Sequence, residues 1–403
     1  MAVFITVKDL RKDDKMEKNI SILGVTGSVG MQALDVALAR GYGVDLISAN
    51  SDVSGAESAA RRLKPRFVAM ADENAARELK SSLSDTDIKV LSGPRGIIDG
   101  IFESQSDVIV NSIIGAAGLE PTLAVIDAKK RLALANKESL VIAGTEVMRR
   151  AESSGVEIIP VDSEHSAIFQ SLRAGKKSEI KKIILTASGG PFFGRTKKEL
   201  RGVTLEDTLR HPTWKMGKKI TVDSATLMNK GFEVIEAAHL FSVPESKIQV
   251  TVHRESILHS AVEYIDNSVI GELSVPDMRM CVQYAVDYPE RCVSNSAELD
   301  LFSVAKLTFL PVDEDAFPLL PLAKRALMLG GGMGAVLNAA DEVAVGAFLR
   351  GEVAFYEISE IVSETFSRLE NRCTDKTIED FFDADREARL LTSEIIKSTR
   401  RKI

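Results

Sequence analysis

Short apolar runs alternate with helical patterns along the first part of the chain. The run at 20–25 leads through a glycine-rich turn into residues 31–40, where apolar side chains recur at spacings of three and four. Strands that alternate with helices form parallel sheets through right-handed crossovers. The pattern therefore predicts an α/β, doubly wound Rossmann-like domain over residues 1–162. Its further expected strands are 44–50, 66–70, 107–113, 131–136 and 156–161.

The pattern changes beyond residue 162. Two of the later apolar runs meet at Asp266-Asn267, a turn that favours antiparallel pairing. We expect an α+β catalytic domain over 163–290 and a linker, rich in acids and proline, over 291–320. From 321 to 403 the apolar spacing is helical, which predicts a C-terminal helical bundle. The expected strands of the second domain are 181–188, 247–253, 261–266 and 268–275.

Composition narrows the choice of partners. Of the 403 residues 45% are hydrophobic, which is enough for real cores, and the formal net charge of -7 argues against nucleic acid as a partner. The sequence has no run of roughly 18 apolar residues, so no membrane span is expected. Residues 1–19 mix acids with lysines, unlike a secretory or transit signal, and predict a short solvated N-terminal extension. The three widely spaced cysteines fit a reducing compartment, and we expect a cytoplasmic protein.

The glycine turn at residues 24–30 follows the first strand and opens a helix. Such a turn lets a pyrophosphate approach the backbone N–H groups of the helix N-terminus, although a tight turn that binds nothing is the plainer alternative. Asn50 and Ser51 stand where an acid would select NAD, and the next basic residue is Arg61. An uncharged strand end favours NADP over NAD, because no acid repels the 2′-phosphate.

Carboxylates gather at the end of the expected strand 156–161. If the strand continues, Asp162 and Glu164 point to the same side, because strand side chains alternate every two residues. The plainer interpretation is a helix N-cap, which explains one acid. Together with Glu233 they predict a three-carboxylate site for Mg²⁺ or Mn²⁺, since these hard ions prefer oxygen ligands.

The segment 211–236 combines anion donors with acids. Asn229, Lys230 and Glu233 fall within one helical turn, and Ser224 is expected as the helix N-cap. Lys230 and Glu233 alone are typical of an exposed surface pair. Because His211 and Ser224 add further donors, we expect a phosphate site beside the metal site.

The segment 186–219 has the composition of a lid. Glycines and basic residues surround the only tryptophan, Trp214, which together with Met216 would exclude water when the lid closes. An ordinary surface loop is the alternative. Upstream, Lys137 follows the strand 131–136 at the carboxyl edge of the sheet, where it could balance an oxyanion.

The chain resembles the 1-deoxy-D-xylulose 5-phosphate reductoisomerase family in GVTGSVG (24–30), ALANKESLV (133–141), PVDSEHSAIFQ (160–170), TASGGPF (186–192), HPTWKMGKKITVDSATLMNKG (211–231) and AVLNAADEVAV (335–345). The resemblance implies NADPH and a divalent metal as cofactors. It implies metal ligands Asp162, Glu164 and Glu233; catalytic residues Lys137, Glu164 and His211; substrate contacts Ser163, Ser188, His211, Trp214, Met216, Ser224, Asn229 and Lys230; and cofactor contacts Gly24, Thr26, Gly27, Ser28, Val29, Ser51, Asn136, Glu138 and Gly217.

Two stretches depart from the family pattern. Asn50-Ser51-Asp52 replaces the family's frequent glycine, basic residue and asparagine, which bears on the contact to a 2′-phosphate. His253-Arg254-Glu255-Ser256 replaces the more usual His-Pro-Gln-Ser, with loop shape as the expected consequence.

The resemblance implies a phosphorylated sugar substrate that is rearranged by retro-aldol and aldol steps and then reduced by NADPH, for isoprenoid synthesis. It also implies a homodimer. A metal-independent NAD(P) dehydrogenase of similar layout and a non-catalytic dinucleotide sensor are the alternatives. Loss of activity in EDTA distinguishes the first, and the absence of a metal-dependent change in Trp214 fluorescence distinguishes the second.

Overall fold

A parallel sheet organises the first part of the molecule, as predicted, and it has seven strands rather than the six expected. The computed structural model describes residues 18–214 and 216–400, so the predicted N-terminal extension up to Glu17 lies outside the described residues. The strand order is β4-β3-β2-β1-β5-β6-β7. Successive strands are added on one side of β1 up to β4 and on its other side from β5 onward, so the strand order reverses between β1 and β5. The strands are β1 (Asn19–Leu23), β2 (Gly43–Ala49), β3 (Phe67–Met70), β4 (Lys89–Ser92), β5 (Val108–Asn111), β6 (Arg131–Leu134) and β7 (Ile158–Pro160).

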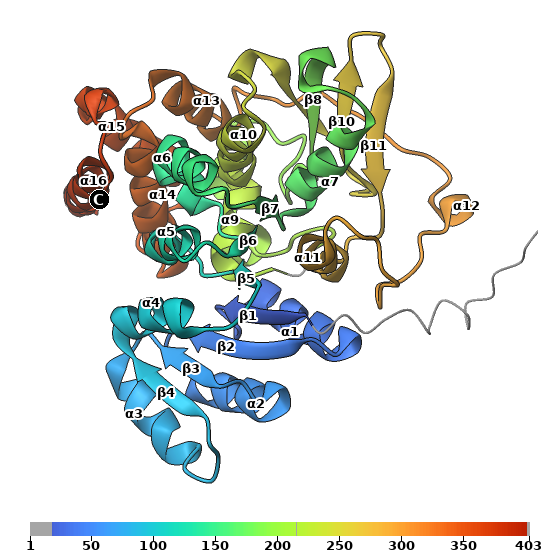
Figure 1. Ribbon diagram of the computed structural model, residues 1–403. Coiled ribbons are helices and arrows are strands. Elements are labelled where there is room, and N and C mark those ends of the chain that lie inside the picture. The colour runs from blue at the N-terminus through green and yellow to red at the C-terminus, as the bar shows by residue number, and fades with distance from the viewer. Residues whose placement is uncertain (1–17, 215, 401–403) are drawn as a thin grey trace, which may run out of the picture.

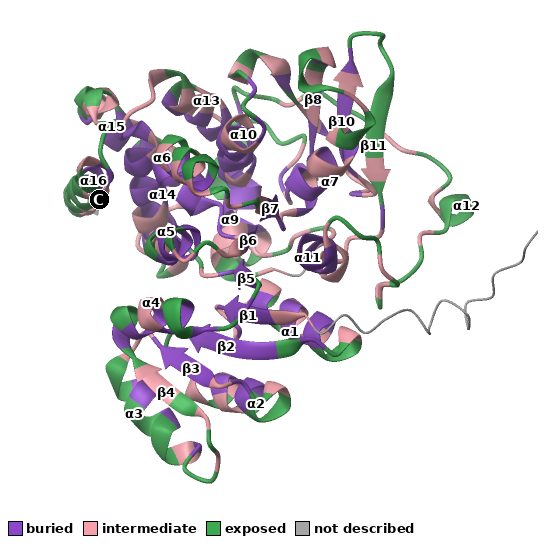
Figure 2. Ribbon diagram, in the orientation of Figure 1, coloured by how far each residue is buried: buried purple, intermediate pink, exposed green. Residues whose placement is uncertain are grey.

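The central strands are buried because helices cover both faces of the sheet, which explains their nearly continuous apolar runs (Figure 2). β4 lies at the edge and is partly exposed, so it lacks such a run, and the sequence analysis did not identify it. The helices of this part are α1 (Ser28–Arg40), α2 (Val53–Leu63), α3 (Glu73–Ser82), α4 (Gly93–Glu103), α5 (Leu119–Asp127) and α6 (Glu138–Ser154).

A second sheet of four strands has the order β11-β10-β8-β9. β10 pairs antiparallel with β11 through the turn at Asp266-Asn267, so the predicted hairpin is confirmed. β8 and β9 pair in parallel, so the sheet is mixed rather than purely antiparallel. The strands are β8 (Ile180–Ala187), β9 (Ile248–Val252), β10 (Leu258–Tyr264) and β11 (Val269–Leu273).

The helix expected to start at Ser224 is two helices. α9 (Lys218–Thr226) ends at Leu227, whose φ of 60° breaks the helix, and α10 (Met228–Phe241) starts there. Ser224 lies in the last turn of α9, and Gly217 is the N-cap, so the expected Ser224 N-cap was wrong. The break places Ser224 on a different helix from Asn229 and Lys230.

Four helices follow the irregular stretch after Arg291, as expected: α13 (Leu319–Leu329), α14 (Met333–Leu349), α15 (Phe355–Arg368) and α16 (Ile378–Arg400). They pack beside α10 and α6 (Figure 1). One apolar core joins these four helices to α10 and to the second sheet. None of the helices in the described residues is long and apolar enough to cross a membrane. The remaining α-helices are α7 (Ser163–Ser171), α8 (Leu205–Thr208), α11 (Met278–Asp287) and α12 (Leu301–Val304). The 3-10 helices are Ala116–Gly118, Leu172–Ala174, Lys177–Glu179, Glu199–Gly202, Glu245–Lys247 and Glu370–Thr374.

Candidate active site

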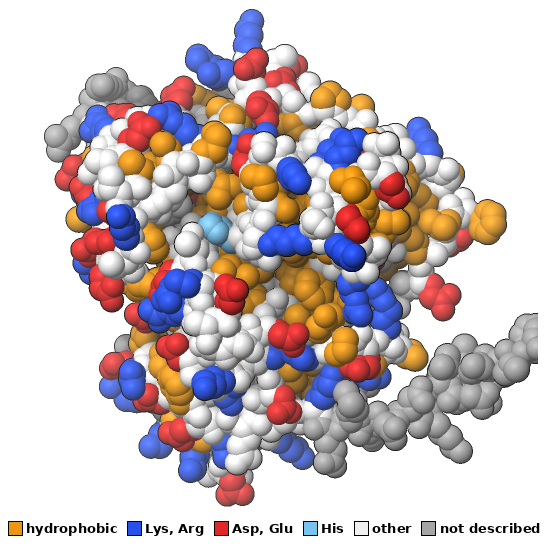
Figure 3. Space-filling view, turned by 45° about the horizontal axis from the view of Figure 1, so that its top comes forward, with side chains coloured by type: hydrophobic (Ala, Val, Ile, Leu, Met, Phe, Trp, Pro, Cys, Tyr) orange, Lys and Arg blue, Asp and Glu red, His pale blue; other side chains and the backbone are white. Residues whose placement is uncertain are grey.

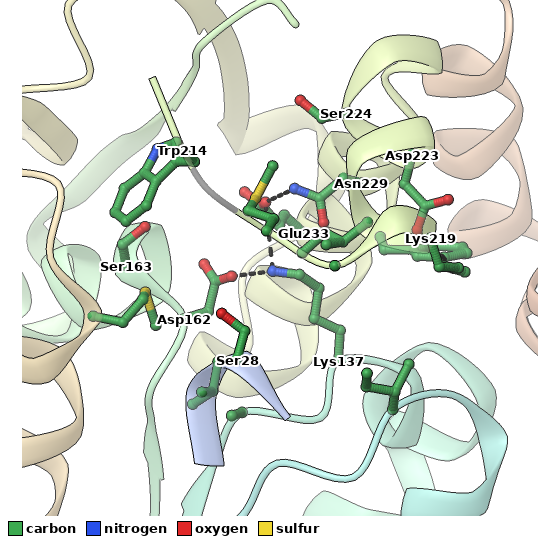
Figure 4. A pocket seen from close by; sticks show the side chains of 18 of the residues that line it. Ser28, Lys137, Asp162, Ser163, Trp214, Lys219, Asp223, Ser224, Asn229 and Glu233 are labelled. Carbon is green, nitrogen blue, oxygen red and sulfur yellow. Dashed lines mark hydrogen bonds and ion pairs between the residues drawn. The ribbon is translucent and has the colours of Figure 1, made fainter. Parts of the chain in front are cut away.

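A cleft lies where the carboxyl ends of β1, β5, β6 and β7 face α9 and α10. It includes the point where the strand order reverses, which is where ligands bind in open α/β sheets. Figure 4 shows Lys137, Asp162 and Glu233 meeting in the cleft, from the loop after β6, the end of β7 and α10, with Ser28 of the glycine turn nearby. On the face shown in Figure 3, acidic and basic side chains are interspersed over the surface.

Three carboxylates converge on one point of the cleft. Asp162 precedes α7, Glu164 lies in its first turn, and Glu233 comes from α10; one oxygen of each lies within 4.8 Å of the others. Asp162 also accepts a hydrogen bond from the Glu164 backbone N–H, at 3.1 Å. Capping and convergence thus occur together, and the helix turn rather than strand alternation brings the two acids to one side. An all-oxygen set of this size fits Mg²⁺ or Mn²⁺.

Two lysines lie against the acid cluster. Lys137 pairs with Asp162 and approaches Glu233 at 3.5 Å, while Lys230 pairs with Glu164 at 3.1 Å and with Glu233. Burial alone would lower the pKa of Lys137, but these carboxylates raise it well above its ordinary value. Burial and the charge of Glu164 raise the pKa of Glu233 to about 7. The mutual repulsion of these carboxylates makes the cluster receptive to a cation.

His165 supports the acids from behind. It is fully buried; its Nδ1 lies 3.0 Å from Asp162 and 3.3 Å from Glu236, and its Nε2 lies 2.9 Å from the backbone oxygen of Glu233. Burial opposes protonation, but Glu236 and Asp162 outweigh it and raise the pKa of His165 to about 9. The ring therefore ties α7 to α10 and fixes the acid spacing.

Anion donors lie next to the acid cluster. Asn229 donates to Glu233 at 2.6 Å, and Ser188 Oγ lies 3.0 Å from Nε2 of His211. Nδ1 of His211 accepts from the backbone N–H of Trp214 at 2.9 Å, so the ring proton sits on Nε2. Burial and nearby Arg254 lower the pKa of His211 to about 4, so the ring is neutral and donates to an oxygen through Nε2. Ser188, His211, Ser224, Asn229 and Lys230 all line the cleft.

The glycine turn reaches the cleft with its second half. Gly27 is the N-cap of α1, and Gly27, Ser28 and Val29 line the cleft. A Cβ on Gly30 would lie 2.1 Å from the Gly24 oxygen, so the turn is too tight for another residue. Gly24, Thr26 and Ser51 are not part of the lining; Ser51 is exposed just after β2. Arg61 is not free to bind a 2′-phosphate there, because it pairs with Glu57 and Asp85.

The loop after β6 organises the centre of the cleft. Asn136 donates to the backbone oxygens of Ile113 and Gly115, at 2.7 and 3.0 Å, and to Glu138 at 2.8 Å. The amide thus holds the loop after β5, whose Ile113 and exposed Ile114 line the cleft. The sequence analysis did not identify these two isoleucines. Only the strand order, with β5 next to β1, brings them to the glycine turn.

The lid candidates Trp214 and Met216 line the cleft, as do Gly217 and Ser163. The ring centroids of Trp214 and His259 lie 6.1 Å apart. Ser163 donates to Glu164 at 2.6 Å, beside the acid cluster. The structure therefore brings together every predicted site residue except Gly24, Thr26 and Ser51. Lining residues that the sequence analysis missed include Gln32, Ser112, Ile113, Ile114, Lys219 and Met278.

Lys219 belongs to a second buried ion cluster. Its ammonium group lies 2.7 Å from Asp223 and 2.9 Å from Asp341 of α14. Burial opposes the charge, but both carboxylates outweigh it and raise the pKa of Lys219 well above its ordinary value. This cluster fixes α9 on α14. No sequence spacing links residues 219 and 341, so only the fold reveals the contact.

A doubly wound sheet with a glycine turn, an acid cluster and anion donors in one cleft defines a dinucleotide-binding protein with a composite metal and phosphate site. Sequence profiles of 1-deoxy-D-xylulose 5-phosphate reductoisomerase match residues 20–144, and those of its C-terminal domains match residues 158–241 and 273–391. The chain belongs to the 1-deoxy-D-xylulose 5-phosphate reductoisomerase family.

Individual relatives agree along nearly the whole chain. The reductoisomerase of Acetivibrio thermocellus is 51% identical over 95% of this chain and 100% of its own, and that of Agathobacter rectalis is 49% identical over 90% and 96%. The structure of the Zymomonas mobilis enzyme in complex with NADPH matches with a TM-score of 0.88 and 37% identity, over 95% of this chain and 100% of that one. A reductoisomerase structure with NADPH, fosmidomycin and magnesium matches with a TM-score of 0.90 and 36% identity, over 95% and 99%.

Proposed function

We infer that this protein converts 1-deoxy-D-xylulose 5-phosphate to 2-C-methyl-D-erythritol 4-phosphate, with NADPH and a divalent metal, in isoprenoid biosynthesis. The family membership and the relatives' NADPH and magnesium complexes support this activity. The observation that carries it in this chain is the convergence of Asp162, Glu164 and Glu233 within 4.8 Å, beside the anion donors of α9 and α10.

We propose roles for the chain's own groups from their positions. Asp162, Glu164 and Glu233 would hold the metal, which as a Lewis acid stabilises charge on substrate oxygens. Lys230, Asn229 and Ser224 would bind the phosphate from one side, and Ser188 and neutral His211 from the other. A phosphate anchored in this way keeps the two halves of a cleaved carbon chain together, so that recombination is effectively intramolecular.

The reacting end of the substrate would lie between Ser163 and Lys137. Lys137 is positively charged in this setting and suits an oxyanion, and Glu164 at the cleft wall is the proposed base for proton movement. NADPH supplies the hydride, and we propose that it contacts Gly24, Thr26, Gly27, Ser28, Val29, Ser51, Asn136, Glu138 and Gly217. Trp214 and Met216, on the proposed lid over 186–219, would exclude water from the cleft.

The direct test is NADPH consumption with 1-deoxy-D-xylulose 5-phosphate, with and without added Mg²⁺ or Mn²⁺. The reaction is followed at pH 7.5 and at lower pH. We expect turnover that EDTA abolishes and that either metal restores. Turnover that persists in EDTA would favour a metal-independent dehydrogenase. Cofactor binding without turnover, and without a metal-dependent change in Trp214 fluorescence, would favour a dinucleotide sensor.

We also propose a homodimer built on the outer edge of the second sheet. β11 is the edge strand, and its Val269, Ile270 and Leu273 are 53%, 40% and 39% exposed. An exposed apolar strand edge is a liability in a monomer and suits pairing with a second copy. Sedimentation should give a dimer for the wild type, and Ile270→Lys should dissociate it. A monomeric wild type would contradict this proposal.

The division into parts and the location are proposals of the same kind. We keep the cofactor part at 1–162, the catalytic part at 163–290, the linker at 291–320 and the helical part at 321–403. A cytoplasmic location is supported by the cysteines Cys281, Cys292 and Cys373, which form no disulfide. Limited proteolysis and cell fractionation would test them.

A further inference from the structure

Arg254 has no role in the proposed function, although it lies beside the proposed phosphate site. It follows β9 in the loop to β10, within the stretch that departs from the family pattern. Its Nη1 donates to the backbone oxygens of Ser188 and Gly190, at 3.1 and 2.7 Å. The guanidinium carbon also lies 5.5 Å from the ring centre of Phe193. These contacts hold the side chain against one loop.

The loop held by Arg254 contains one proposed phosphate donor, Ser188, and packs against a second, Ser224. Gly190 of this loop packs directly on α9, where a Cβ would lie only 2.6 Å from the backbone oxygen of Ser224. Gly190 also has a φ of 64°, which glycine adopts at little cost. Arg254 therefore anchors the loop that sets the distance between Ser188 and Ser224.

Arg254 forms no ion pair with an acidic residue among the described residues. Its neighbour Glu255 is engaged elsewhere, with Thr308 at 2.7 Å and with His253 at 3.1 Å. By contrast, Lys230 is paired with Glu164 and Glu233. The field of Arg254 reaches the cleft, because after burial it is the next cause of the low pKa of His211.

A phosphate dianion needs positive charge close by as well as hydrogen-bond donors. His211 is neutral, and the charge of Lys230 is already offset by two acids. We propose that Arg254 is a positioning and specificity-determining residue of the phosphate site, which orients the Ser188–Gly190 loop and supplies uncompensated positive charge that favours a dianionic substrate. The inference rests on the proposed function, because it deepens the same site.

The test compares Arg254→Gln, which removes the charge, with Arg254→Lys, which keeps it. Arg95→Gln is the matched control for net charge, since Arg95 is exposed on α4 and does not line the cleft. Thermal unfolding verifies that all variants fold. For Arg254→Gln we expect the KM for 1-deoxy-D-xylulose 5-phosphate to rise about tenfold, with kcat and the KM for NADPH within about twofold. Arg254→Lys should recover most of this loss, and Arg95→Gln should behave as the wild type.

Binding of inorganic phosphate, measured by calorimetry on the full chain, provides a second readout that needs no turnover. Arg254→Gln should bind phosphate about tenfold more weakly than the wild type. Unchanged KM and unchanged phosphate affinity in Arg254→Gln would overturn the inference, as would equal losses in Arg254→Lys and Arg254→Gln. If the wild type binds phosphate more tightly than Arg254→Gln but does not turn over the sugar phosphate, only the proposed function is contradicted.

Discussion

Replacing Glu233 with glutamine should stabilise the metal-free protein and abolish turnover. Glu233 is buried and belongs to a cluster of three carboxylates with Asp162 and Glu164. The ammonium groups of Lys137 and Lys230 lie against this cluster. Glutamine has nearly the same shape, and it leaves two acids facing two lysines. The substitution therefore removes one of three mutually repelling carboxylates together with one proposed metal ligand.

The size of the stability gain follows from the pKa of Glu233. Burial and Glu164 raise this pKa from 4.5 to about 7, so the folded protein disfavours the charged carboxylate by about 3 kcal/mol, at about 1.4 kcal/mol for each tenfold change in proton affinity. The folded state binds the proton more tightly than the unfolded state. The destabilisation is therefore absent below pH 4.5, grows as the pH rises to about 7, and is constant above it. Glu233→Gln should recover up to about 3 kcal/mol at pH 7.5.

The assay is chemical unfolding in EDTA and in Mn²⁺, combined with NADPH consumption. Wild type should gain stability from Mn²⁺, while Glu233→Gln should be more stable in EDTA, insensitive to Mn²⁺ and inactive. Glu236→Gln is the matched control, because Glu236 is buried on the same helix with its pKa also raised to about 7, but lies outside the ligand set. It should keep the response to Mn²⁺. A Glu233→Gln variant that is active in limiting Mn²⁺ would refute the reasoning.

Lys230→Ala should raise the KM for the sugar phosphate by a factor of about 10 to 150, because one charge-assisted hydrogen bond contributes about 1.5–3 kcal/mol; equal inhibition of variant and wild type by a phosphonate mimic would count against it. Ser51→Arg should lower the KM for NADPH about threefold and leave that for NADH unchanged, since an exposed arginine after β2 can pair with a 2′-phosphate; parallel changes for both cofactors would contradict this. His239 packs on Gly144, and burial lowers its pKa to about 4, below the ordinary 6.5. The unfolded state thus binds the proton first, so stability is full above pH 6.5 and falls toward pH 4; urea unfolding should show about 2 kcal/mol lost from this group between pH 7.5 and 5.0, and His239→Met should reduce that loss.

The sequence was sufficient for the large sheet and for the acid cluster, for different reasons. Strands buried on both faces are nearly continuous apolar runs, so β1, β2 and β5 are visible directly. β4 lies at the edge and carries no such run. Asp162 and Glu164 are close in sequence, and Glu233 lies in a stretch specific enough to identify its family. The prediction that Asp162 and Glu164 converge was right, although a helix cap rather than a continued strand brings them together.

Features that depend on backbone breaks or on strand order could not be predicted. Nothing in the local sequence marks Leu227 as left-handed, so one expected helix proved to be two, with Ser224 at the end of the first. Ile114 reaches the cleft because β5 lies beside β1, and Lys219 meets Asp341 because α14 packs on α9. Such contacts join distant segments, and pattern and spacing carry no information about them.

The most direct test of the whole account is the anomalous difference density of a crystal soaked in MnCl₂ with NADPH. We predict one strong peak between the carboxylates of Asp162, Glu164 and Glu233, within coordination distance of an oxygen of each. The nicotinamide ring should lie in the same cleft. Carboxylates that remain paired with Lys137 and Lys230, with no peak between them at saturating Mn²⁺, would contradict the central claim.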